Sequence, residues 1–123
     1  MKFGGSCLTS QSSLDKVLDY VRQYKNPIIV VSALSGVTDS LIKAADNGGD
    51  IDKIISRHYI ALPENIEIHY YKELNEKANV LKALLTIYSM NRNSTFLESH
   101  IQSFGERFSA LMLKYFLEAN GIK

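Results

Sequence analysis

The sequence predicts an α/β protein, namely an incomplete parallel-sheet αβα sandwich that carries an inserted helical hairpin. The β-branched run at residues 28–31 is typical of a strand that is buried on both faces of a parallel sheet. A short apolar segment at residues 1–3 is expected to end a first strand, and apolar residues at helical spacing lie between the two. Strand, helix and strand in this order form a βαβ unit, whose crossover is expected to be right-handed.

The first helix is expected to begin after Thr9 or Ser10, either of which is a suitable N-cap. One face of this helix is apolar and comprises Leu14, Val17, Leu18, Val21 and Tyr24. Asn26 and Pro27 then introduce the second strand, and the small residues of segment 32–36 close it with a turn.

A short helix is expected after that turn, and it ends at the Gly48 and Gly49 break. Residues 50–90 have a helical pattern almost throughout, interrupted at Pro63. One apolar face before the proline comprises Ile51, Ile54, Ile55, His58 and Leu62. The face after it comprises Leu74, Ala78, Leu81, Leu85 and Tyr88. We therefore expect a helical insertion at about residues 50–93.

The last helix is expected to begin at Ser94 or Thr95 and to run to about Asn120, with Gly121 as the glycine that follows its C-cap. Ile122 would then lead into a third strand. Since two strands do not make a stable parallel sheet, we expect these residues to be the first part of a larger fold.

Composition excludes several classes of protein. The chain has 123 residues, 46% of them hydrophobic and 22% charged, as in an ordinary folded domain. A net charge of +1 gives no sign of nucleic-acid or membrane-surface binding, and no apolar run approaches the roughly 20 residues needed to span a bilayer. Cys7 is the only cysteine, so no internal disulfide can form, and no export signal is evident. A cytoplasmic location is expected.

Two small-residue turns are expected at one edge of the sheet. Gly4 and Gly5 follow the first strand, and segment 32–36 follows the second. Each turn leads to a helix N-terminus, which attracts anions, and Lys2 adds a positive charge nearby. The pattern indicates a phosphate site, although a plain strand-to-helix turn would also explain the glycines. The GxxxxGK[ST] and GxGxxG motifs are both absent from the sequence.

The last helix carries Glu106 away from its apolar stripe, so this side chain is either a solvated glutamate or part of a site. Gly105 costs a helix about 1 kcal/mol relative to alanine, which suggests that another backbone or a ligand approaches closely. His58, His69 and His100 are too scattered to be metal ligands, so we predict no metal site in the protein itself.

Three segments together resemble aspartate kinases. KFGGSC is similar to the KFGGTS opening of that family, VVSALSGVTD to its second glycine turn, and SFGERFSALML to its SxGExxSA helix. The resemblance spans residues 1–123, but only the N-terminal portion of the family's amino acid kinase domain. It implies that the nucleotide-binding half and the regulatory ACT domains are absent from this chain.

The resemblance also implies roles for the first turn. Lys2 would be catalytic by neutralising the transferred phosphoryl group, and Gly4 and Gly5 would offer backbone N–H groups to the ATP phosphates. Ser6 stands where the family usually has threonine and keeps a hydroxyl group. Cys7 stands where the family usually has serine, which leaves no role assigned to it.

For the amino acid, the resemblance implies a site lined by Ser32 and Thr38, with Gly36 permitting close approach. Glu106 would bind the ammonium group of L-aspartate. The implied reaction is ATP- and Mg²⁺-dependent phosphorylation of the aspartate side-chain carboxylate to 4-phospho-L-aspartate, the first step towards lysine, threonine and methionine. The intact protein is expected to be a homo-oligomer.

Two alternatives remain open. One is another carboxylate kinase of the same superfamily, such as one for glutamate or N-acetylglutamate. The other is a non-catalytic phosphate-binding module. An acetylated substrate lacks the ammonium group, so the effect of removing the Glu106 carboxylate on aspartate binding distinguishes an aspartate kinase from an N-acetylglutamate kinase.

Overall fold

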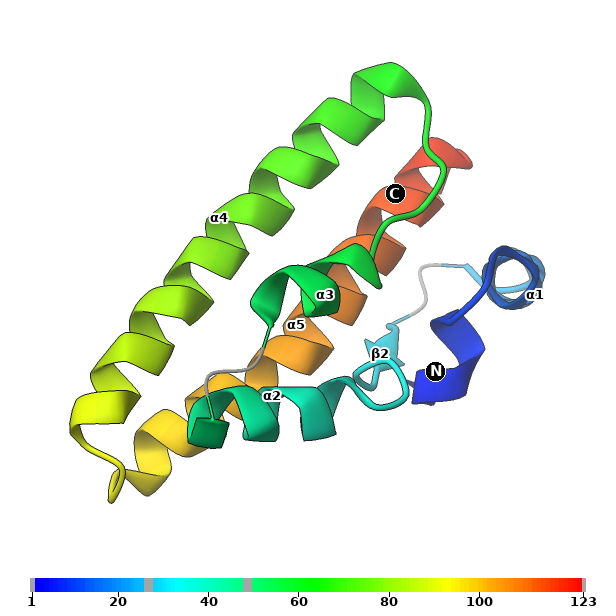
Figure 1. Ribbon diagram of the computed structural model, residues 1–123. Helices are drawn as coiled ribbons and strands as arrows, with labels where there is room; N and C mark the ends of the chain where they lie inside the picture. Colours follow the sequence, from blue (N-terminus) through cyan, green and yellow to red (C-terminus); the bar gives the residue numbers. More distant parts are fainter. Residues whose placement is uncertain (1, 26–27, 48–49, 123) are drawn as a thin grey trace.

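A computed structural model describes residues 2–25, 28–47 and 50–122 (Figure 1). Helices dominate, and one small parallel sheet lies near the N-terminus, so the predicted α/β class is confirmed. The elements are, in order, β1 (Lys2–Phe3), the 3₁₀ helix η1 (Gly5–Leu8), α1 (Gln11–Val21), β2 (Val30–Val31), α2 (Val37–Asn47), α3 (Ile51–Ser56), α4 (Glu64–Met90) and α5 (Thr95–Ala119).

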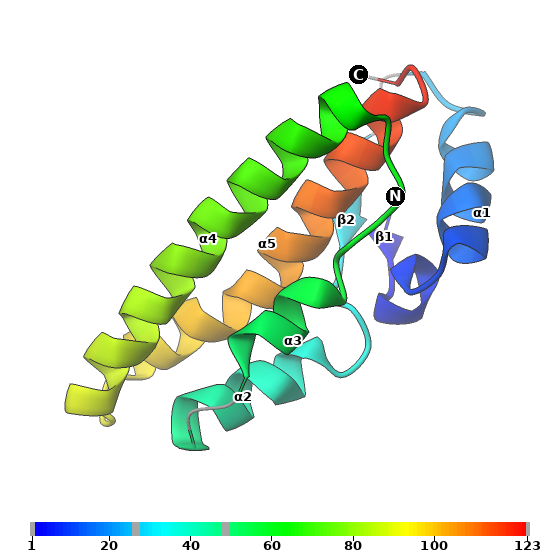
Figure 2. The same cartoon turned by 45° about the horizontal axis from the view of Figure 1, so that its top comes forward.

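The sheet consists of β1 and β2, which pair in parallel with Lys2 opposite Val30 and Phe3 opposite Val31. The ladder continues by one hydrogen bond, which Ser32 N–H donates to the Phe3 carbonyl at 3.0 Å. Figure 2 shows the two strands between α1 on one side and α5 on the other. This arrangement is the predicted incomplete αβα sandwich.

The prediction that segment 28–31 is a strand buried on both faces is wrong in part. Only Val30 and Val31 pair as a strand, and Ile28 and Val30 are 82% and 54% exposed. Ile29 and Val31 pack against the core instead. Side chains alternate in direction along a strand, so Val30 is exposed where its neighbours Ile29 and Val31 reach the core.

Helix α1 begins directly after Ser10, as predicted, and the Ser10 side chain accepts a hydrogen bond from Ser13 N–H at 3.1 Å. The helix ends at Val21, so Tyr24 is not part of its buried face, contrary to the prediction. Tyr24 is half exposed, and its hydroxyl donates to that of Tyr20 at 3.3 Å. The predicted features at Asn26 and Pro27, and at Gly48 and Gly49, lie outside the described residues.

Helix α3 ends at Ser56, seven residues before the predicted break at Pro63. A continuing helix would need the His58 carbonyl to accept from the N–H group four residues later. Instead that carbonyl accepts from the hydroxyl of Tyr70 on α4. The chain has already left the helix at this point, since the N–H groups of His58 and Tyr59 donate to the carbonyls three residues back. Helix α4 begins after Pro63, whose carbonyl accepts from Ile66 N–H at 2.9 Å.

Helices α4 and α5 are long and antiparallel, and they form much of the molecule (Figure 1). Ser94 caps α5 by accepting from Leu97 N–H at 3.1 Å, and Gly121 follows its end with φ +83°, both as predicted. The largest fully buried side chains of this pair are Tyr70, Leu74, Leu81, Ile101, Phe104, Phe108 and Met112. No helix in the described segments is long and apolar enough to cross a bilayer.

His58 lies between α3 and α5 and is fully buried, with its ring 5.3 Å from that of Phe108. Nδ1 lies 2.8 Å from the Ile54 carbonyl, whereas buried Nε2 has no partner among the described residues. Burial lowers the pKa of His58 to about 4 from its ordinary value of 6.5. The ring is therefore neutral in the folded protein near neutral pH.

This shift predicts a loss of stability in mild acid. Between about pH 6.5 and pH 4 the unfolded chain protonates His58 and the folded chain does not, so the free energy of unfolding falls as the pH is lowered. The loss attributable to this ring is on the order of 3 kcal/mol. Urea unfolding across this pH range measures it.

The matched variants for this measurement are His58→Leu and His69→Gln, the second of which changes an exposed histidine on α4. The His58→Leu chain is expected to lose stability less steeply with falling pH, and the His69→Gln chain as steeply as the wild type. Equal pH dependence in all three proteins would show that His58 does not carry the effect.

Candidate functional site

The two predicted turns lie at the same end of the sheet because β1 and β2 run in parallel. Gly4 and Gly5 directly follow β1, and segment 32–36 directly follows β2. The first turn leads into η1 and the second into α2, whose first turn carries the exposed Thr38. The predicted proximity of the two turns is therefore confirmed.

Gly5 is where the turns touch. A Cβ atom on Gly5 would clash with the Ala33 carbonyl oxygen and lie 3.0 Å from the Ser35 nitrogen, so a side chain would push the turns apart. A Cβ on Gly4 would meet nothing within 4 Å. The absence of a side chain at Gly5 is thus required by the fold, whereas Gly4 has open space around it that a ligand could occupy.

The second turn owes its shape to Gly36, whose φ of +83° is unfavourable for residues with a side chain. The Gly36 carbonyl accepts from the Ser40 N–H at 3.0 Å and from the Ser40 hydroxyl at 2.9 Å. Val37 N–H donates to the Leu34 carbonyl at 2.9 Å. The turn is therefore held firmly to the start of α2.

Gly105 joins α5 to the same turn. A Cβ on Gly105 would lie 2.7 Å from the Ala33 Cβ and 3.3 Å from Val37 Cγ1. The predicted close approach at Gly105 is confirmed. The groups that approach it are side chains of the second turn and α2. Ala33 is therefore packed between Gly5 and Gly105. No role for Ala33 is predicted from the sequence. The one feature that could have indicated tight packing here is a small residue within the second glycine turn.

Glu106 follows Gly105 and lines a cavity of about 360 Å³ between α5 and β2. The other residues that line this cavity are Ile29, Val30, Val31, Ser103, Arg107 and Ala110. The Glu106 side chain is exposed, and its carboxylate has no ion-pair partner within the described part of the chain. Val30, on the wall of the cavity, pairs with Lys2. Glu106 therefore lies beside β2, and Lys2 belongs to the neighbouring strand β1.

Ser6 does not line this cavity. It lines a separate hollow of about 350 Å³ with residues of β1 and α1, and its carbonyl accepts from the Thr9 hydroxyl at 3.2 Å. Of the predicted phosphate-binding residues, Ser6 therefore faces another part of the surface. The side chain of Cys7 is outside the described residues.

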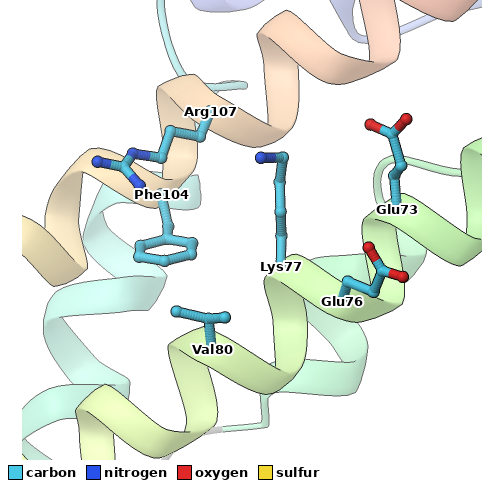
Figure 3. A pocket seen from close by; sticks show the side chains of 6 residues that line it. All are labelled: Glu73, Glu76, Lys77, Val80, Phe104 and Arg107. Carbon is cyan, nitrogen blue, oxygen red and sulfur yellow. The ribbon is translucent and has the colours of Figure 1, made fainter.

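A third cavity of about 390 Å³ lies between α4 and α5 (Figure 3). Arg107 extends over the Phe104 ring at 5.1 Å from its centre and makes a cation–π contact there. On the opposite side, Glu73 accepts from the Tyr115 hydroxyl. Burial and this carboxylate raise the pKa of Tyr115 to about 12.

The packing of Ala33 predicts a coupled effect on stability. Gly105→Ala is expected to lower the free energy of unfolding. Overpacking typically costs about 1–3 kcal/mol of stability, and the replacement of glycine by alanine in a helix offsets only about 1 kcal/mol of that cost. In an Ala33→Gly background the clashing Cβ is gone, so Gly105→Ala becomes neutral or stabilising. Chemical unfolding of the four chains measures this coupling.

Gly4→Ala serves as the control glycine replacement, because its Cβ would meet open space and its φ is −73°. We expect it to change stability little. Additive effects of Gly105→Ala and Ala33→Gly would be incompatible with the packing described above.

Comparisons with known proteins agree on the fold. E. coli aspartokinase III in complex with lysine and aspartate superimposes with a TM-score of 0.85 at 20% identity, over 99% of this chain and 29% of that one. The same enzyme with aspartate and ADP gives a TM-score of 0.81 at 22% identity, with the same coverage. The fold described here is thus that of part of an aspartokinase.

Sequence relatives agree as well. The chain is 26% identical to the chloroplastic bifunctional aspartokinase/homoserine dehydrogenase 2 of Arabidopsis thaliana, over 99% of this chain and 15% of the relative. The chain therefore spans less than a third of the length of each of these proteins. The amino acid kinase family matches residues 1–123. This chain belongs to the amino acid kinase family.

Proposed function

We propose that the chain is the N-terminal portion of a kinase that transfers a phosphoryl group from ATP to the side-chain carboxylate of L-aspartate. The observation that carries the proposal is the packing of Gly5 and Gly105 against Ala33, which brings the first glycine turn, the second turn and the helix of Glu106 together. The likeness to E. coli aspartokinase III, whose structures contain aspartate and ADP, supports it.

In this proposal the first turn receives the phosphates. The exposed Lys2 neutralises the phosphoryl group in transfer, and the N–H groups of Gly4 and Gly5 donate to phosphate oxygens. Open space next to Gly4 supports this assignment. Ser6 is retained as a phosphate-binding candidate through its hydroxyl, although its present cavity lies towards α1.

The second turn and α5 receive the amino acid. Ser32 and Thr38 line the site, and Gly36 lets the ligand approach the backbone. Glu106 binds the ammonium group, for which an exposed carboxylate without an ion-pair partner in the described part is well suited. A ligand without an ammonium group leaves this carboxylate unpaired and is therefore discriminated against.

The chemistry needs no general base. A β-carboxylate has a pKa near 4 and is already ionised at neutral pH, so catalysis consists of positioning and charge neutralisation. Mg²⁺ supplies part of that neutralisation when bound with ATP. No cluster of three acidic, histidine or cysteine ligands occurs within segments 2–25, 28–47 and 50–122. We therefore assign no residue of this chain to the metal ion.

The proposal extends to the organisation of the whole protein. Residues 1–123 form the N-terminal portion of an amino acid kinase domain, with a helical insertion at about 50–93. The nucleotide-binding half and any ACT domains lie beyond this sequence. The product enters lysine, threonine and methionine synthesis, the intact protein is a cytoplasmic homo-oligomer, and nucleic acids and membranes are not its ligands.

Titration of the ¹⁵N-labelled chain with L-aspartate tests the amino acid site. We expect amide shifts at Ser32, Gly36, Thr38 and Glu106, and at least a roughly tenfold weaker affinity in Glu106→Gln, because hydrogen bonds to a charged group contribute about 1.5–3 kcal/mol. N-acetyl-L-aspartate, which lacks the ammonium group, should bind the two proteins equally. Unchanged aspartate affinity in Glu106→Gln would remove the assigned role.

A second prediction concerns turnover by the chain alone. We propose that these 123 residues have no appreciable kinase activity, since no adenine or ribose site is identified among them. A coupled assay of ADP release with aspartate, ATP and Mg²⁺ measures this directly. Turnover that depends on both aspartate and Lys2 would contradict the proposed division of the domain.

A further inference from the structure

A basic cleft of about 520 Å³ lies between α2 and α3, which pack side by side (Figures 1 and 2). Lys43 projects from α2, and Lys53 and Arg57 come from α3 and its C-cap. Ser40, Asp50 and Ile54 complete the lining. The proposed kinase function uses none of these six residues.

The three cations of this cleft lack ion-pair partners. Within residues 2–25, 28–47 and 50–122 the single ion pair joins Lys82 and Asp52 at 3.4 Å, outside the cleft. Asp50 is the one carboxylate in the lining, and it caps α3 by accepting from the Lys53 N–H at 3.3 Å. Positive charge therefore exceeds negative charge in a confined space.

The dipole of α3 explains only part of this pattern. Lys53 and Arg57 lie near the C-terminal end of the helix, where cations are favoured. Lys43 comes from a different helix and gains nothing from that dipole. The convergence of cations from two helices on one cleft is typical of a site for an anion with more than one charge.

Arg57 connects the cleft to the second glycine turn. Its Nη1 lies 3.5 Å from the position that a Cβ on Gly36 would occupy. Ser40, also in the cleft, donates its hydroxyl to the Gly36 carbonyl at 2.9 Å. A ligand that engages Arg57 and Ser40 would therefore contact residues that touch the Gly36 turn.

We propose that this cleft binds a small oxyanion with at least two negative charges, through Lys43, Lys53 and the guanidinium group of Arg57. Guanidinium binds phosphate and carboxylate oxygens with paired hydrogen bonds, so phosphate esters and di- or tricarboxylates share the required chemistry. Binding changes the surroundings of Gly36 through Arg57. This site is separate from the proposed phosphate turn, and it does not rest on the proposed function.

Two titrations of the ¹⁵N-labelled chain at low ionic strength test the proposal, one with inorganic pyrophosphate and one with citrate. We expect saturable shifts at the amides of Lys43 and Ile54, together with a shift at Gly36. Saturation with only one probe supports the proposal and shows whether the cleft accepts phosphates or carboxylates. Arg57→Gln and Lys53→Gln should each weaken the affinity about threefold, as expected for exposed charges.

Asp50→Asn should act in the opposite direction. Asparagine keeps the cap of α3 but removes the negative charge from the cleft, so the affinity should rise about threefold. Lys72→Gln and Asp19→Asn make the same changes of net charge on α4 and α1 and should leave the affinity unaltered. Equal effects of the cleft variants and these controls would overturn the proposal.

Lys2→Gln separates the two anion sites. The proposal requires that this variant leave the shifts at Lys43 and Ile54 intact. If Lys2→Gln abolishes those shifts and Arg57→Gln does not, the ion occupies the first turn, which supports the proposed function and refutes the cleft. Absence of saturable shifts at both amides with both probes also refutes it.

Discussion

The contact of Ala33 with two glycines is the constraint on which the rest of the structure depends. Gly5 brings the first turn against the Ala33 carbonyl, and Gly105 brings α5 against its methyl group. A side chain at either glycine would separate elements that the proposed site needs together. Because Lys2 lies three residues before Gly5 and Glu106 directly follows Gly105, this packing limits how the two ends of the proposed site lie relative to each other.

This arrangement suits a reaction that depends on positioning. In the proposed reaction a carboxylate nucleophile needs no proton removed, so the protein would contribute mainly by holding two ligands in line and by balancing charge. Rigid backbone contacts achieve this better than long side chains, which must lose rotamer freedom on binding. The basic cleft between α2 and α3 would bind another anion, in addition to the ATP phosphates, next to Arg57 and the Gly36 turn.

Much of the fold could be predicted from local signals. The caps at Ser10 and Ser94, the helix that follows Pro63 and the parallel strand pair all follow from residue type and spacing. The early end of α3 could not, because the segment that follows it is held by a contact distant in sequence, in which the Tyr70 hydroxyl on α4 donates to the His58 carbonyl. The exposure of Val30 could not be predicted either, because it depends on which elements pack against each face of the strand. In the site, glycines and charges were recognisable, whereas Ala33 gains importance only from its three-dimensional neighbours.

The most direct test of the central contact is a proton NOESY spectrum of the chain in solution. The structure predicts strong cross-peaks between the Ala33 methyl group and the α protons of Gly105, since the two Cβ positions would lie 2.7 Å apart. It also predicts cross-peaks between the Gly5 α protons and the amide proton of Ser35. A well-folded spectrum without these cross-peaks would show that the turns and α5 do not meet at Ala33, and the account of the site would be wrong.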